Sequence, residues 1–351
     1  MTLRIEGHKL QYHPDRLADL LAGRTVWPVY AEVSPVSACN HRCLFCNFNY
    51  LGHEAKRLPD GRMITLMDEF AQGGIKAVVF AGAGEPSLHP DTFPAMRRAK
   101  EHGIDMAMST NGALLRPGQL DEMAELLTWT RFSINGGTPE AYALAQGAKP
   151  EDFGKALEAL SALADRKEKR KSAITIGSQC VLVPENRDSI VSLAREVKQR
   201  GADYFSVKHF YPHEENFYRP DMAFRTPEYL RSLHEAAAEL SDDGFKFIVR
   251  DVEDLERRRP YAACLGLPFI IYIREDGRLY TCFSHQEDEK TAIGDLLASD
   301  FVSLWRSSAK DAAIDHLNRY AKNRCQANCR HHQINIWLAQ LTHFPPHVNF
   351  I

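Results

Sequence analysis

The chain has 351 residues, of which 44% are hydrophobic and 25% are charged, and its formal net charge is −3. This composition excludes a disordered tail, a collagen-like repeat and a small disulfide scaffold. Without a basic excess, there is no reason to expect nucleic acid as a partner. The apolar runs are shorter than the roughly 18 residues of a membrane span, and the first residues lack the apolar centre of a secretion signal. We therefore expect a cytoplasmic protein without a membrane partner.

Short apolar runs rich in β-forming residues alternate with helical patterns from residue 31 to residue 242. The expected strands are Ala31–Ser37, Lys76–Ala81, Asp105–Ser109, Thr130–Asn135, Ile174–Val183 and Tyr204–His209. The expected helices are Thr65–Ala71, Pro94–His102, Pro117–Leu127, Pro150–Leu163, Asn186–Gln199 and Pro227–Leu240. This alternation predicts an α/β fold with a parallel sheet, either an open barrel or a doubly wound sheet.

The pattern changes after Asp242. The runs Phe269–Ile273 and Arg278–Cys282 flank a turn that contains Gly277, which predicts a β-hairpin. The segment Asp300–Tyr320 has a helical pattern. We expect a domain boundary near residue 245.

The first group of cysteines is Cys39, Cys43 and Cys46, a C-x3-C-x2-C run directly after the first expected strand. Three thiolates do not complete a tetrahedral zinc site, and a cubane iron–sulfur cluster normally takes four. The run therefore indicates a cluster with one iron left open for another ligand. A zinc knuckle completed by His41 or His53 is the alternative that the spacing permits.

The residues around this run resemble the radical S-adenosylmethionine (SAM) superfamily, in which an apolar residue precedes the third cysteine, here Phe45. Three further segments match in order: Gly82–Pro86, in which Ala83 replaces one glycine, Ser109–Gly112 and Arg131–Gly136. The resemblance implies that SAM binds the open iron and contacts Phe45, Gly84, Glu85, Ser109, Asn111, Ser133, Asn135 and Gln179. Asn135 stands where many members have Asp, so it offers a hydrogen bond without a charge.

The resemblance also implies a fold and a domain order. Radical SAM enzymes have a partial (β/α)6 barrel, with active residues at the carboxyl ends of the strands. We assign an N-terminal extension to residues 1–30, the barrel to 31–245, and a small α+β auxiliary iron–sulfur domain to 246–351.

The second group of cysteines is Cys264, Cys282, Cys325 and Cys329. The spacing of the first two around Gly277 resembles an auxiliary-cluster element of the family. Four thiolates suffice for one closed [4Fe–4S] cluster. The segment resembles the single-cluster form, the Twitch domain, of SPASM/Twitch enzymes. A structural zinc site with four cysteines is the alternative.

This resemblance implies that a 5′-deoxyadenosyl radical removes a hydrogen atom from the substrate, and that the auxiliary cluster accepts an electron. It implies a radical SAM oxidoreductase, most similar to aminocyclitol (2-deoxy-scyllo-inosamine) dehydrogenases, with a flavodoxin- or ferredoxin-like electron donor. The segment before Cys39 is short for a peptide-recognition domain, so we expect a small polar substrate such as a sugar, an aminocyclitol or a nucleotide derivative. Peptide or protein maturation is an alternative, and a zinc or electron-transfer protein is the non-enzymatic one.

Two further residues are candidates for catalysis. Lys208 ends the sixth expected strand, where it would act as a general base or bind a phosphate, unless it lies on an ordinary surface loop. Cys180 lies on the fifth strand. Strand alternation turns Gln179 inward and Cys180 toward the helices, so Cys180 is either an inert buried thiol or the hydrogen donor of a redox-neutral epimerase.

Overall fold

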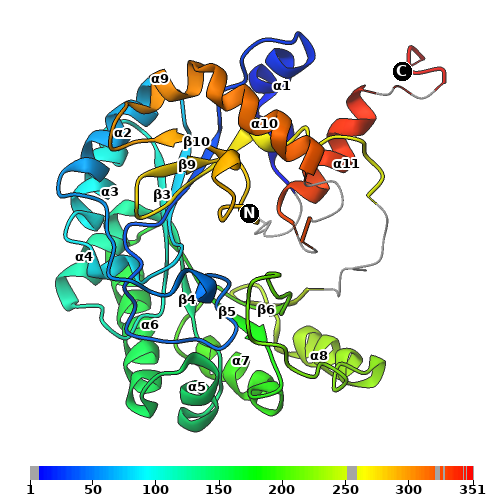
Figure 1. Ribbon diagram of the computed structural model, residues 1–351. Coiled ribbons are helices and arrows are strands. Elements are labelled where there is room, and N and C mark those ends of the chain that lie inside the picture. Colours follow the sequence, from blue (N-terminus) through cyan, green and yellow to red (C-terminus); the bar gives the residue numbers. More distant parts are fainter. Residues whose placement is uncertain are drawn as a thin grey trace.

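The computed structural model describes residues 8–250, 259–320, 325–326, 329–342, 344 and 346–350. Their strands form one sheet in the order β10-β9-β8-β1-β2-β3-β4-β5-β6-β7. The strands are β1 (Tyr30–Val33), β2 (Ala77–Phe80), β3 (Asp105–Thr110), β4 (Leu127–Ser133), β5 (Thr175–Leu182), β6 (Tyr204–His209), β7 (Lys246–Val249), β8 (Ile270–Ile273), β9 (Arg278–Tyr280) and β10 (Ala292–Asp295). Strands β1 to β7 are parallel and curl into a partial barrel, as expected (Figure 1).

Helices of the βαβ units form the outer layer of this barrel (Figure 1). They are α2 (Arg62–Gln72), α3 (Thr92–Glu101), α4 (Pro117–Leu126), α5 (Pro139–Gln146), α6 (Pro150–Arg170), α7 (Ile190–Gln199) and α8 (Pro227–Leu240). Several begin with proline at the first helical position, where its missing N–H costs no hydrogen bond. Among the described residues, none lies in a helix long and apolar enough to cross a membrane.

The register of the strands separates two faces of the sheet. Phe80, Met108, Phe132, Ile176 and Phe205 belong to one buried cluster, which packs between the sheet and the outer helices. Alternate positions point to the opposite side, because successive side chains of a strand alternate. We call this opposite side the inner face.

The sheet continues past the boundary expected near residue 245. Strand β7 pairs with β6 and extends the barrel by one strand beyond the six expected. On the other edge, β8 pairs in parallel with β1, and β9 returns antiparallel to β8 as the expected hairpin. The division into an extension, a barrel and an auxiliary domain stays a prediction.

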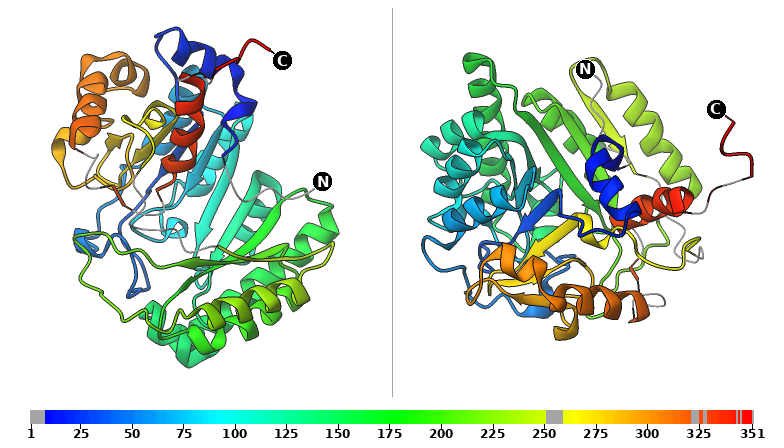
Figure 2. Two further views of the ribbon diagram at one scale, coloured as in Figure 1. Left: turned by 90° about the vertical axis from the view of Figure 1, so that its right-hand side faces the viewer. Right: turned by 90° about the horizontal axis from the view of Figure 1, so that it is seen from above.

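The remaining helices are α1 (Pro14–Leu21), α9 (Phe301–Arg306), α10 (Ser308–Tyr320) and α11 (His331–Thr342). Both views of Figure 2 show α1 (blue) and α11 (red) side by side. Leu10 and Leu338 belong to the same buried cluster there, and the ring centroids of His8 and Trp337 lie 4.8 Å apart. Segments from the two ends of the chain thus pack together beside the hairpin.

Candidate active site at the carboxyl ends of the strands

The first cysteine group lies on the loop that follows β1, at the carboxyl end of the parallel strands. Burial raises the pKa of Cys39 to about 11 and that of Cys43 further, and the neighbouring thiols of Cys46 and Cys39 add to the effect on Cys43. Thiols buried and crowded in this way do not readily lose their protons when no metal is bound. A bound metal would keep them deprotonated.

His41 supports this loop and is not placed to bind metal. Its Nε2 lies 3.3 Å from Oδ2 of Asp152, and its Nδ1 accepts a hydrogen bond of 3.1 Å from the Gln146 side chain. Both ring nitrogens are therefore engaged, and burial lowers the pKa of the ring. The other candidate for a fourth zinc ligand, His53, has its Nε2 2.7 Å from Oδ1 of Asn49, whereas its buried Nδ1 has no hydrogen-bond partner among the described residues.

Glu85 is a buried carboxylate at the end of β2. It accepts hydrogen bonds from the Thr110 hydroxyl at 2.7 Å, from the Asn111 backbone N–H at 2.8 Å and from the Ser87 hydroxyl at 2.8 Å. Burial raises its pKa. These bonds fasten the segment after β2 to the end of β3, where the sequence predicted SAM contacts.

Gly84 lets the same segment approach the cysteine loop. A Cβ on Gly84 would lie 2.4 Å from the carbonyl oxygens of both Val36 and Ala38. The next residue, Glu85, donates its backbone N–H to the Ala38 carbonyl at 3.0 Å. Only glycine fits between these backbone atoms.

Four further residues predicted to contact SAM have the following places in the structure. The Asn111 side chain donates to Oδ1 of Asn40 at 2.7 Å and lies 3.9 Å from Sγ of Cys39. Phe45 packs beside a small buried cluster that contains Phe210. Ser133 and Gln179 are register partners on β4 and β5. The structure thus brings Asn111 and Gly84 against the cysteine loop.

Asn135 is tied into the scaffold more fully than the sequence suggested. Its Oδ1 accepts the Val181 N–H at 2.7 Å, and its amide donates to Oε1 of Gln146 at 3.1 Å. The Asn186 side chain in turn donates to its backbone carbonyl at 3.0 Å. These bonds join the ends of β4 and β5 to α5. The contact of Asn135 with SAM stays a prediction.

The second group of cysteines converges beside the hairpin. Burial raises the pKa of Cys282 well above its usual value, and the thiols of Cys329, Cys264 and Cys325 raise it further, so all four lie close together. The Asn335 side chain donates to Sγ of Cys264 at 3.0 Å. The four cysteines come from the segment after β9, the loop before β8 and the segment before α11.

The spacing of the thiols bears on which metal could bind. Among the residues that the structure describes, neither group holds three sulfur atoms that all lie within 4.8 Å of one another. Zn–S bonds of about 2.3 Å in a tetrahedron place the sulfurs about 3.8 Å apart. In the described part of the chain, no three thiols of either group are that close together.

The two cysteine loops are in contact with each other. The rings of Phe48 and Phe283 pack edge to face, with centroids 5.5 Å apart. The loop after β6 bridges them as well: the Asn216 side chain donates to the Cys46 carbonyl at 3.0 Å, and Nε2 of His213 lies 3.0 Å from the Ser284 carbonyl. Sequence analysis did not identify these bridging residues, because no motif joins positions so far apart in the chain.

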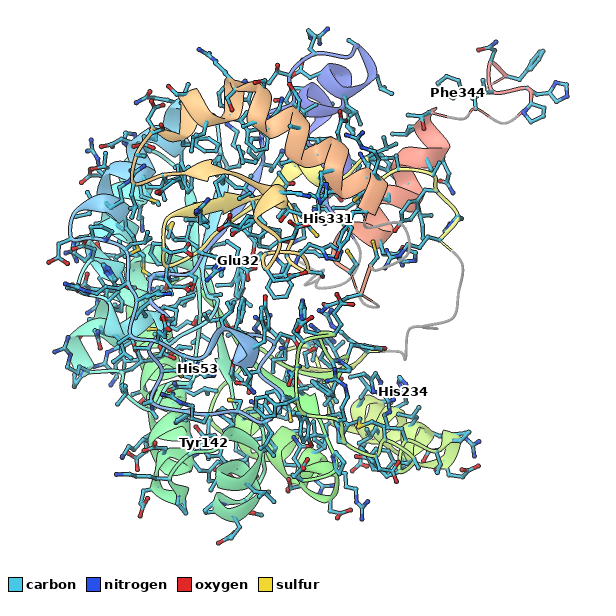
Figure 3. All side chains as sticks on the ribbon, in the orientation of Figure 1. Glu32, His53, Tyr142, His234, His331 and Phe344 are labelled. Atoms are coloured by element: carbon cyan, nitrogen blue, oxygen red, sulfur yellow. The ribbon has the colours of Figure 1, made fainter. Side chains whose placement is uncertain are left out.

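Charged side chains gather on the inner face of the barrel. Arg131 donates to the Ser109 hydroxyl at 3.2 Å and to Oε1 of Gln179 at 3.3 Å. Arg330, next to Cys329, forms an ion pair of 2.8 Å with Glu32 of β1. Figure 3 shows Glu32 on the inner side of the strands, whereas Tyr142 lies in the outer helical layer. Lys208 lies within β6 at a position that alternates to this face, so it does not lie on an ordinary surface loop.

Cys180 lies on the other side of the sheet, as strand alternation predicted. It is fully buried in the cluster between the strands and the outer helices. Burial raises the pKa of its thiol, and the Asn186 amide lies 3.4 Å from its sulfur. Its role as a hydrogen donor stays a prediction that the geometry does not favour.

Comparison with known proteins identifies the part of the chain that carries the first site. Residues 33–197 match the family model described as the radical SAM superfamily. The chain contains a radical SAM domain. This domain runs from the last residue of β1 into α7, and it includes the first cysteine loop, Glu85 and the inner-face residue Arg131.

Curated relatives of this chain differ in function. It is 27% identical over 191 residues, 52% of the chain, to a tungsten-containing aldehyde ferredoxin oxidoreductase cofactor-modifying protein of Pyrococcus furiosus. It is 26% identical over 178 residues, 49% of the chain, to a dTDP-4-amino-4,6-dideoxy-D-glucose ammonia-lyase of Streptomyces venezuelae. A probable GTP 3′,8-cyclase of Pyrobaculum aerophilum is 28% identical over 173 residues, 47% of the chain. The matches span 51%, 36% and 52% of these relatives.

Solved structures share the fold over most of the chain. SuiB of Streptococcus suis superimposes with a TM-score of 0.67 and 15% identity, covering 91% of this chain and 76% of SuiB. The protein anSMEcpe with bound AdoMet gives 0.59 and 17%, covering 82% of this chain and 80% of that protein. These similarities extend beyond the radical SAM domain into the C-terminal part.

Proposed function

We propose that this protein is a radical SAM oxidoreductase that acts on a small polar substrate, such as a sugar, an aminocyclitol or a nucleotide derivative. The observation that carries the proposal is the first cysteine loop. It offers three thiols within a radical SAM domain, and both ring nitrogens of His41 are already engaged. With His41 engaged, the loop supplies three thiol ligands, which would leave a coordination position of a cluster open for SAM.

Cys39, Cys43 and Cys46 would hold one [4Fe–4S] cluster, and Cys264, Cys282, Cys325 and Cys329 a second, as in a Twitch domain. When bound, the first cluster with SAM supplies a radical that abstracts hydrogen, and the second supplies an electron acceptor. The protein orients SAM and the substrate and excludes water. Glu85 and Asn111 fix the loop that faces SAM. The Phe48–Phe283 contact holds the two cysteine loops in a defined relation.

Anaerobic reconstitution tests the proposal. We expect about eight irons per chain, falling to about four in Cys282→Ala, together with formation of 5′-deoxyadenosine from SAM under reducing conditions. Cys43→Ala should abolish SAM cleavage. The buried Cys180→Ala is the matched cysteine control and should retain the full iron content. Two zinc ions in place of iron, without SAM binding, would favour the zinc alternative.

A panel of deuterated candidates then identifies the substrate class. Deuterium transfer from a labelled sugar, aminocyclitol or nucleotide into 5′-deoxyadenosine supports the proposed class. Transfer only from a peptide would favour peptide maturation. A product at the oxidation level of the substrate, lost in Cys180→Ala, would favour the epimerase.

A further inference from the structure

Positive charge accumulates on the inner face of the barrel. In the strand register, Arg131 of β4 pairs with Gly177 of β5, and Lys208 of β6 pairs with Val181 of β5. Gly177 and Val181 are four residues apart on β5, so Arg131 and Lys208 point to the same face of the sheet. Arg250 follows β7 at a position that alternates to the same side. Strands β4 and β6 and the segment after β7 thus each direct a cation to the same face of the sheet.

The charges of these side chains act on Lys208. Burial and the charges of Arg131, Arg250 and Arg330 lower the pKa of Lys208 to about 8, and only Glu32 acts in the opposite direction. Each arginine comes from a different element: β4, the end of β7 and the segment before α11. Lys208 therefore faces a surface formed by several parts of the fold.

Among the described residues, no acidic group forms an ion pair or a hydrogen bond with Lys208 or Arg131. Glu32 already forms an ion pair with Arg330. Arg131 donates its hydrogen bonds to two neutral groups, the Ser109 hydroxyl and the Gln179 side chain. No described residue forms a hydrogen bond or an ion pair with the Lys208 ammonium. Holding like charges together in a partly buried place is unfavourable unless an anion binds there.

We propose that the substrate carries an anionic oxygen group, a carboxylate or a phosphate, which Lys208 and Arg131 bind on the inner face. This inference rests on the proposed function, because it describes the substrate of that reaction. The guanidinium of Arg131 is a planar, directional hydrogen-bond donor, and the ammonium of Lys208 is a compact positive charge. Both kinds of group bind carboxylates and phosphates. The group would sit beyond the ends of β4 and β6, on the same side of the sheet as Ser109 and Gln179.

Direct binding measurements on the reconstituted protein with SAM test this inference without requiring turnover. The probes are inorganic phosphate, D-glucuronate and uncharged D-glucose, titrated calorimetrically at low ionic strength. We expect phosphate, glucuronate or both to bind at least tenfold more tightly than glucose. Phosphate alone would identify a phosphorylated substrate, and glucuronate alone a carboxylated one.

Variants separate a binding role from a structural one. Lys208→Met should weaken binding of the favoured anion at least tenfold without lowering the melting temperature, because it removes a cation from a repulsive group. Lys208→Arg should retain binding. The exposed Lys169→Met on α6 is the matched control and should bind like the wild type.

Equal binding of the anions and glucose would overturn the inference, as would Lys208→Met with the affinity of the wild type. These results are distinguishable from failure of the proposed function. That failure would appear as absent SAM cleavage in the wild type, whatever the anions do.

Discussion

The substitution Gly84→Ala tests how the cysteine loop is held against the barrel. The added methyl carbon would lie 2.4 Å from the carbonyl oxygens of Val36 and Ala38, whereas ordinary contacts begin at 3.4 Å. The two backbone oxygens lie on a segment that leads directly into Cys39, so no flexible side chain can move away. The segment must retreat by about 1 Å, and overpacking of this kind costs about 1–3 kcal/mol.

The matched control is Gly154→Ala in α6. A Cβ there meets no atom within 4 Å, and the position is exposed and helical. Replacing a glycine inside a helix by alanine stabilises by roughly 0.5–1 kcal/mol. The two substitutions, which add the same atom, should therefore change the free energy of unfolding in opposite directions.

The assay is urea denaturation of the reconstituted protein under anaerobic conditions, followed by circular dichroism, with iron content and SAM affinity measured in parallel. We expect Gly84→Ala to lower stability, SAM affinity and iron content together. Gly154→Ala should change only stability, upward. If Gly84→Ala kept the stability, iron and SAM affinity of the wild type, our reasoning about the close approach of the two segments would be wrong.

Three further predictions follow from single contacts. Glu85→Gln places an amide N–H against a hydrogen-bond donor, either the Thr110 hydroxyl or the Asn111 N–H. The free energy of unfolding should therefore fall by about 1–3 kcal/mol in the same urea assay. An unchanged denaturation midpoint would contradict the hydrogen bonds to the buried carboxylate. The affinity for the favoured anion should fall as the pH rises through about 8, because burial and the charges of Arg131, Arg250 and Arg330 lower the pKa of Lys208 to about 8, with Glu32 acting in the opposite direction. Calorimetry in Lys208→Arg should show no such fall, and a fall of the same size would assign it to another group. Asn335→Leu removes the hydrogen bond to Sγ of Cys264. Because hydrogen bonds to the sulfurs tune the potential of a cluster, the reduction potential of the second cluster should become more negative in a redox titration followed by electron paramagnetic resonance (EPR). An unchanged potential would contradict this contact.

Periodicity was sufficient to predict the barrel strands and their helices because each is a local pattern. The β6 strand begins and ends at the expected residues, Tyr204 and His209, and the hairpin around Gly277 is present. Strand β7 was missed because Lys246–Val249 is too short to show alternation. The pairing of β8 with β1 was also missed, since it joins segments more than two hundred residues apart, and no local signal specifies such a contact.

In the candidate site, too, the sequence predicted the residues that form a local pattern but not the contacts between distant segments. Spacing identified Cys39, Cys43 and Cys46, because ligands on one tight loop are neighbours in sequence. The sequence did not reveal that His41 is held by Asp152 and Gln146, or that Asn216 reaches the cysteine loop from beyond β6. These contacts depend on how the barrel curves. A motif can therefore identify the ligands while the fold supplies the residues that hold them.

EPR of the dithionite-reduced, reconstituted protein, recorded before and after addition of SAM, tests the central claim most directly. We predict two [4Fe–4S]⁺ signals, of which the one lost in Cys43→Ala shifts on SAM addition and the one lost in Cys282→Ala does not. A protein that carried zinc, or whose Cys43-dependent signal did not respond to SAM, would contradict the open coordination position at the first cysteine loop.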